Sequence, residues 1–115
     1  MDTTVSKSTT RIAILGAGMS GLGAAAKLKE AGYSVIDIFE KSDGVGGTWR
    51  DNTYPGCGCD VPSHLYSYSF ELNPDWDYKW SLQPQILKYF EDFADKYDVR
   101  RHCRFNTEIT DCRWS

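Results

Sequence analysis

Three glycines and a serine lie close together in the segment GAGMSG, as Gly16, Gly18, Ser20 and Gly21. Glycines at this spacing let the backbone turn sharply after a strand, approach a pyrophosphate and pack a following helix tightly against that strand. The free N–H groups and the positive dipole end of such a helix would face the phosphates. Glycine turns are common, so a dinucleotide site is predicted only if strands and a helix surround this one.

An acidic residue, Glu40, follows Gly21 by about 20 residues, at the expected end of a second strand. A carboxylate at that point can accept hydrogen bonds from ribose hydroxyls, and it would repel an additional 2′-phosphate. The residues therefore predict a first site for FAD or NAD and exclude NADP from it.

The surrounding pattern supplies the required elements. Ile12 to Leu15 is an apolar run typical of a buried parallel strand, and Val35 to Phe39 is a second one. A helix is predicted between them over residues 19–31, with Gly32 ending it and Gly23 indicating close packing or the close approach of a ligand. Its sheet-facing side is expected to carry Leu22, Ala24, Ala25, Leu28 and Ala31. The fold class is α/β, a partial Rossmann-like domain that begins with a parallel β-α-β unit.

A second helix is expected after the glycine-rich and aromatic stretch 41–80. Pro84 would open it, with Ser81 or Gln83 near its cap. Its apolar face repeats at helical spacing and is interpreted as core: Ile86, Leu87, Phe90, Phe93, Ala94 and Tyr97. Two short strands are predicted beyond it, over residues 103–107 and 109–114.

Composition excludes several classes of protein. The chain has 115 residues, enough for one small domain, and a net charge of −3 with no basic cluster, which argues against nucleic acid. No apolar run approaches the ~20 residues of a membrane span, and the polar N-terminus is no secretory signal. We expect a cytoplasmic protein with a disordered tail over residues 1–10 and a domain over 11–115. Cys57 and Cys59 lack the spacing of a metal or redox pair, so no metal site and no disulfide are predicted.

Four segments resemble the N-terminal part of class B flavoprotein monooxygenases, the Baeyer–Villiger monooxygenases and the related flavin-containing monooxygenases. The segments are EKSDGVGGTW, YPGCGCDVPSHLYSYSF, LQPQILKYFEDFADKYDV and FNTEIT. GAGMSG alone is generic, whereas GGTW followed by these aromatic segments is specific. Amine oxidases share the early glycines but usually carry Gly-Gly-Arg where this chain has Gly47-Thr48-Trp49.

The resemblance implies FAD in the first site, NADPH as reductant and O2 as co-substrate. One oxygen atom would be inserted into a ketone through a C4a-peroxyflavin; oxygenation of a soft nitrogen or sulfur is the alternative. The GAGMSG turn would hold the pyrophosphate and Glu40 the ribose. The other implied cofactor contacts are Gly47, Thr48, Trp49 and Tyr66 beside the flavin, Ile109 at the adenine through its backbone, and Gly58 and Cys59 at NADP.

Asp60 matches a family aspartate placed beside the flavin and the nicotinamide, and it is the predicted catalytic residue. It is a lone acid in an aromatic, glycine-rich loop, where burial could shift its pKa. The alternative is an aspartate that caps a turn. For Trp49 the alternative to a flavin contact is core packing.

Three features of the family do not occur within these 115 residues. Missing are the second glycine-rich motif, the family fingerprint and the arginine that partners the aspartate. We therefore expect a fragment of such an enzyme, inactive by itself and marginally stable. The second hypothesis is a non-catalytic nucleotide-binding or interaction fragment that associates with a full-length relative.

Overall fold

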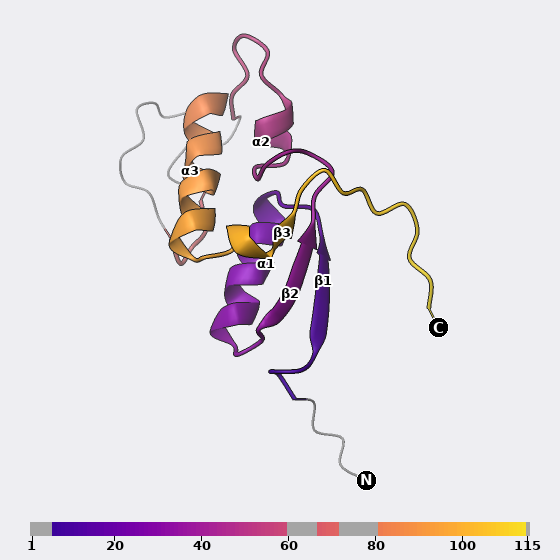
Figure 1. Ribbon diagram of the computed structural model, residues 1–115. Helices are drawn as coiled ribbons and strands as arrows, with labels where there is room; N and C mark the ends of the chain where they lie inside the picture. The colour runs from indigo at the N-terminus through magenta and orange to yellow at the C-terminus, as the bar shows by residue number, and fades with distance from the viewer. Residues whose placement is uncertain (1–5, 60–66, 72–80, 115) are drawn as a thin grey trace.

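A parallel β-α-β unit forms the first part of the fold, in a computed structural model that describes residues 6–59, 67–71 and 81–114. Strand β1 (Arg11–Leu15) leads into helix α1 (Met19–Glu30) and then into strand β2 (Val35–Phe39). The strands pair in parallel, from Arg11 opposite Val35 to Leu15 opposite Phe39. Both strands therefore end at the same edge of the sheet, beside the start of α1 (Figure 1). This part of the fold is as predicted.

The sheet continues with β3 (Cys103–Arg104), which pairs in parallel with the end of β2, so the order is β1-β2-β3. The 3₁₀ helix η2 (Arg100–His102) precedes β3, and Nδ1 of His102 lies 3.0 Å from the carbonyl oxygen of Ile36. This side chain joins η2 to β2 one step before the strand pairing begins. The strand predicted over 103–107 is confirmed only at residues 103–104, and the strand predicted over 109–114 does not form in that described segment.

One face of the sheet is covered by helices. Helix α1 buries Leu22, Ala25 and Ala26, whereas Ala24 and Ala31, predicted to face the sheet, are exposed. A run of alanines does not mark which side of a helix is apolar, so its phase was misjudged. Strand β1 alternates between half-buried and exposed residues, and Leu15 is 59% exposed. Strand β1 was expected to be buried along its whole length, but only the residues on one of its faces are partly buried.

Helix α3 (Gln83–Lys96) lies beside α1 on the same side of the sheet (Figure 1). It starts one residue before Pro84, and its N-cap is Leu82, which lies between Ser81 and Gln83, the two residues predicted near the cap; no side chain caps the helix. Its predicted apolar face is confirmed, with Phe90 and Phe93 almost fully buried.

An aromatic cluster fills the space between α3 and α1. Its rings are Tyr68, Phe70, Tyr89, Phe90, Phe93 and Tyr97. The ring centroids of Tyr68 and Phe93 are 4.3 Å apart. A Cβ added to Gly23 of α1 would lie 2.7 Å from the ring of Tyr68. The close packing predicted for Gly23 is thus contact with this ring.

Residues 6–10, inside the predicted tail, form a turn in which the N–H groups of Thr9 and Thr10 donate to the carbonyl of Ser6. Nζ of Lys7 donates to the carbonyl of Ala31 at 2.8 Å. The segment before β1 is therefore attached to the end of α1.

Candidate functional site

The glycine turn connects β1 to α1 at the edge where both strands end. Gly16 has φ +98 and donates its N–H to the carbonyl of Phe39 at 2.8 Å, so the chain turns while still bonded to β2. Gly18 is the N-cap of α1, with no side-chain cap and no acidic residue in the first turn. The N–H groups of that turn are left for a ligand, and the positive end of the helix dipole favours an anionic one.

Gly21 provides the close contact that the sequence predicted. A Cβ at this position would lie 1.9 Å from the carbonyl oxygen of Gly16. Real Cβ atoms do not approach an oxygen so closely, and the oxygen belongs to the backbone. Glycine is therefore required for the helix to begin directly behind the turn.

A second glycine segment packs against the first. Gly46 donates its N–H to the carbonyl of Ala17 at 2.9 Å, and a Cβ on Gly47 would lie 2.9 Å from Cα of Gly18. Gly47 also has φ +57, which favours glycine. The short helix α2 (Thr48–Asp51), which the sequence analysis missed, begins immediately after it. Two bare backbones thus form the floor of the site.

Glu40 joins these two segments from the end of β2. Its side chain is buried, and Oε1 accepts the N–H of Ala17 while Oε2 accepts the N–H of Ser42, both at 2.8 Å. A carboxylate has about four lone-pair positions, so each oxygen can accept one further hydrogen bond. Sequence reasoning gave Glu40 a role toward ribose alone, and it missed that the same carboxylate holds the glycine turn.

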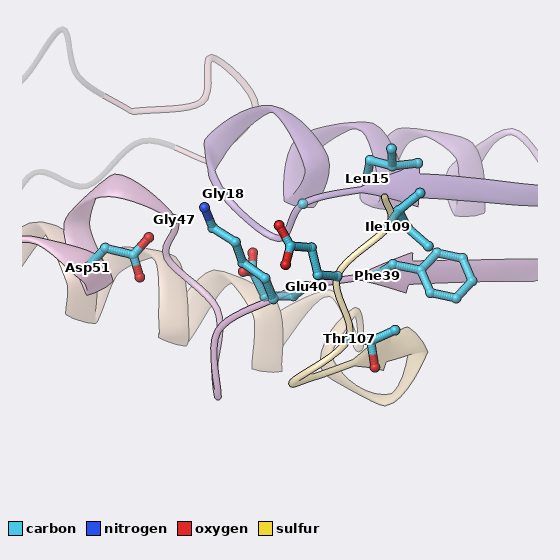
Figure 2. Close-up of a pocket in the computed structure, with 11 residues that line it drawn as sticks. Leu15, Gly18, Phe39, Glu40, Gly47, Asp51, Thr107 and Ile109 are labelled. Atoms are coloured by element: carbon cyan, nitrogen blue, oxygen red, sulfur yellow. The ribbon is translucent and has the colours of Figure 1, made fainter. Parts of the chain in front are cut away.

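Two adjoining cavities open over this floor, and both are lined by Leu15, Gly16, Gly18 and Gly47. The first, the Glu40 cavity, has a volume of about 290 Å³ and also contacts Phe39, Glu40, Lys41, Asp51, Thr107, Glu108 and Ile109. The second, the Trp49 cavity, has about 350 Å³ and also contacts Met19, Ser20, Gly21, Gly46, Thr48 and Trp49. Figure 2 shows the carboxylate of Glu40 directed toward Gly18, with Ile109 and Thr107 on the other side.

The predicted site residues are largely brought together here. Glu40 and Ile109 line one cavity, and Ser20, Gly21, Thr48 and Trp49 line the other. Trp49 is also 9% exposed and part of the hydrophobic core, so most of its ring packs inside the protein.

Two predicted residues lie elsewhere. Gly58 forms a β-bridge with Leu82 at the start of α3, and the N–H of Cys59 donates to the carbonyl of Ser81 at 3.0 Å. Neither is among the described residues that line the two cavities. Asp60 and Tyr66 lie outside the described residues, so their predicted roles stay predictions.

The chain after β3 forms a wall of the Glu40 cavity that sequence reasoning largely missed. The N–H of Glu40 donates to the carbonyl of Arg104 at 3.0 Å, and the N–H of Thr107 donates to the carbonyl of Glu40 at 2.9 Å. Because of these bonds, residues 107–109 lie at the cavity, although these residues form no strand. The only signal for this wall was the family position at Ile109.

The charged residues that line the described part of the Glu40 cavity are Glu40, Lys41, Asp51 and Glu108. Three acids against one base make this end unfavourable for a phosphate, whereas the first turn of α1 favours one. The arrangement suits an elongated ligand with a neutral, hydroxyl-bearing end and an anionic middle.

Metal and thiol chemistry have little support in the part of the chain that the structure describes. There, no group of three or more His, Cys, Asp or Glu side chains could hold a metal ion. All four cysteines are free, and burial raises the pKa of the Cys103 thiol to about 11. Across the described ranges, no helix has the length and apolar character needed to span a membrane.

Residues 14–79 match the family described as "NAD(P)-binding Rossmann-like domain", and the chain belongs to this family. A Baeyer–Villiger monooxygenase of Streptomyces coelicolor is 49% identical over 104 residues, which cover 90% of this chain and 20% of the relative.

Solved structures of monooxygenases are also similar to this chain. Closed cyclohexanone monooxygenase superposes with a TM-score of 0.81 at 43% identity, over 87% of this chain and 20% of that one. A structure named OTEMO complex with FAD and NADP has a TM-score of 0.83 at 36% identity, over 94% and 21% respectively. The predicted resemblance to the N-terminal part of these monooxygenases is confirmed. The chain spans about a fifth of the length of the relatives it matches.

Proposed function

We propose that this chain provides the FAD-binding N-terminal part of an NADPH-dependent flavoprotein monooxygenase of the Baeyer–Villiger type. The observation that carries the proposal is the floor of bare backbone formed by Gly18 and Gly47, between a free helix N-terminus and a buried carboxylate. The 49% identity to a Baeyer–Villiger monooxygenase supports the same assignment.

The described residues fit FAD. A Cβ on Gly47 would collide with Gly18, so the floor has no side chain in the way of a pyrophosphate. The first turn of α1 would bind the phosphates through its N–H groups, and the free lone pairs of Glu40 would accept ribose hydroxyls. The backbone at Ile109 would face the adenine, and Thr48 and Trp49 would lie toward the flavin. When bound, FAD would supply the transfer of electrons from NADPH to O2.

A ketone is the proposed substrate class of the whole enzyme. Cyclohexanone, after which one structural neighbour is named, is a ketone. Oxygenation of nitrogen or sulfur is the alternative reaction. The alternative function is that of a non-catalytic nucleotide-binding fragment that pairs with a full-length relative. The identity to named monooxygenases favours the enzyme part over the non-catalytic fragment.

Asp60 remains the proposed catalytic residue, and Tyr66, Gly58 and Cys59 remain proposed contacts of the flavin and of NADP. Gly58 and Cys59 offer backbone groups for NADP, although the N–H of Cys59 is already bonded to Ser81. Exchange of Asp60 for Ala in a longer protein that contains this chain should abolish oxygenation while FAD stays bound.

The first test is a titration of the purified chain with FAD, ADP and FMN, followed by calorimetry or flavin fluorescence. ADP carries the adenosine and pyrophosphate that the two cavities are proposed to bind, whereas FMN lacks the adenosine. We expect FAD and ADP to compete for one site and FMN to bind much more weakly. A folded chain that binds neither FAD nor ADP would contradict the proposal.

A second test separates nucleotide binding from turnover. The chain spans about a fifth of its relatives, so the chain alone is expected to show no NADPH-dependent oxygenation of ketones or amines. Detectable oxygenation by the pure chain would contradict this expectation.

A further inference from the structure

Ser42 lies behind the Glu40 cavity and makes three hydrogen bonds to three different segments. Its N–H donates to Oε2 of Glu40 at 2.8 Å, and its Oγ donates to Oδ1 of Asp51 at 2.7 Å. Its carbonyl accepts the N–H of Asn106 at 2.9 Å. The three partners belong to the end of β2, to α2 and to the chain after β3, which are the walls of that cavity.

We infer that Ser42 is a positioning residue for the nucleotide, which sets how the three walls of the Glu40 cavity face the adenosine. The inference rests on the proposed function, because it presumes that a nucleotide occupies this cavity. Ser42 itself is not among the described residues that line it, so any effect on the ligand passes through Glu40, Asp51 and Asn106.

The bond to Glu40 aims the carboxylate. With one oxygen bonded to Ala17 and the other to Ser42, the plane of the carboxylate is fixed, and the remaining lone pairs have fixed directions. A ribose diol needs two acceptors in a defined geometry, so this orientation determines whether both hydroxyls can bind. The backbone N–H of Ser42 provides this part of the positioning.

The bond to Asp51 holds an exposed side chain at the end of α2. Asp51 is exposed and is the last residue of α2, a helix of four residues that is too short to be stable alone. The hydroxyl of Ser42 fixes the carboxylate of Asp51 at the wall of the cavity that Glu40 also lines. Two acids held in one cavity oppose a phosphate on the ribose, and this extends the selectivity expected of Glu40 alone.

The same loop provides a matched control. Asp43 is bonded to Arg50 of α2 at 2.9 Å, so it also ties the loop to this helix. Neither residue is among the described residues that line the two cavities. Exchange of Asp43 for Ala therefore tests the attachment of α2 without changing a cavity wall.

The experiment measures binding of ADP and of adenosine 2′,5′-bisphosphate to the 115-residue chain and its variants. Ser42→Ala should weaken ADP binding by about fivefold, the size expected for loss of one hydrogen bond to a partly exposed charged group. It should also reduce the preference for ADP over the bisphosphate. Ser42→Thr keeps the hydroxyl and should restore both values.

A double exchange separates positioning from general stability. Asp51→Ala should lower the preference for ADP over the bisphosphate at least as much as Ser42→Ala, because it removes a cavity-lining charge along with the bond. Adding Ser42→Ala to Asp51→Ala should change the preference little further, because the serine hydroxyl then has no carboxylate to hold. Asp43→Ala should leave the ADP preference unchanged, and circular dichroism should show that every variant is folded.

The outcomes can be distinguished. A wild-type chain that binds no ADP would overturn both the proposed function and this inference. If the wild-type chain binds ADP, then an unchanged preference in Ser42→Ala, or an equal loss in Asp43→Ala, would overturn the inference alone.

Discussion

The glycine-lined site and the aromatic cluster are held together in opposite ways. At the site, backbone approaches backbone, and hydrogen bonds from a buried carboxylate join the segments. In the cluster, rings fill the space between two helices, with the Tyr68 and Phe93 centroids 4.3 Å apart. The site therefore depends on the absence of side chains, and the cluster depends on their bulk.

This difference has a consequence for mutations. Added atoms should damage the site, whereas removed atoms should damage the cluster. Changes to rings of the cluster other than Tyr68, whose hydroxyl is bonded to the first turn of α1, should lower stability and leave the affinity of the folded protein for nucleotide intact. Changes in the site should alter affinity as well. The following four predictions test this contrast, from the largest expected effect to the smallest.

Phe90→Ala should lower the free energy of unfolding by about 4 kcal/mol, because a fully buried ring is removed and a cavity remains. Urea titration measures the loss, and ADP affinity is compared under conditions where the variant is folded. Trp114→Ala is the control, since Trp114 is 99% exposed and its removal should change stability by about 0.5 kcal/mol or less. Reduced ADP affinity in folded Phe90→Ala would break the contrast.

Gly21→Ala should lower the free energy of unfolding by about 3 kcal/mol, because the new Cβ would meet the carbonyl of Gly16. Gly18→Ala is the matched variant, since its Cβ has no heavy atom nearer than 3.5 Å. We expect it to cost about 0.5 kcal/mol of stability and to weaken ADP binding, because Gly18 lines both cavities. Equal stability of the two variants would contradict the close packing of Gly21 against the carbonyl of Gly16.

Glu40→Gln should lower the free energy of unfolding by about 2 kcal/mol, because an amide group replaces one of the two oxygens that accept backbone N–H groups. It should also weaken ADP binding. Glu108→Gln changes an exposed acid of the same cavity and should leave stability unaltered. If thermal unfolding of the two variants is the same, the carboxylate of Glu40 has no structural role.

His102 should give the smallest effect, visible as a dependence of stability on pH. Burial lowers the pKa of His102, and nearby Lys29 and Arg101 lower it further, against the opposing effects of the hydrogen bond to the Ile36 carbonyl and of the charge of Asp98. Its Nε2 is buried, without a hydrogen-bond partner among the described residues. The folded state therefore favours the neutral ring.

The direction in which stability changes with pH follows from this preference for the neutral ring. The stability contributed by His102 is complete above its ordinary pKa of about 6.5 and is lost as the pH falls below it. His102→Asn keeps a donor near Ile36 but does not titrate. We expect the midpoint of thermal unfolding to fall less between about pH 7.5 and about pH 5.5 in this variant than in the wild-type chain. An equal fall in both would contradict the assignment.

The order of elements could be predicted where short-range patterns determine it. Apolar runs marked β1 and β2, glycines marked the turn, and helical spacing marked α3 with its buried Phe90 and Phe93. These signals are local because each element carries its own periodicity. The resemblance added Ile109, which no local pattern indicates.

The remainder depends on contacts between distant segments. Residues 105–109 reach the cavity through bonds from Thr107 and Asn106 to the chain after β2, and nothing in their own sequence encodes this. Helix α2 is too short for a periodic signal, and the backbone ties of Glu40 and Ser42 exist only once the turn is folded. In helix α1, the run of alanines did not indicate which side of the helix faces the sheet.

Tyr68 connects the two regions, because its hydroxyl donates to the carbonyl of Met19 in the first turn of α1 while its ring lies against Gly23. Helix ends commonly fray, with local opening free energies close to zero. Here the turn that would bind phosphate is fastened to the aromatic core. The backbone of this turn should therefore already be ordered before any ligand arrives, so binding need not order it. The bulk of the cluster thus prepares the bare backbone of the site.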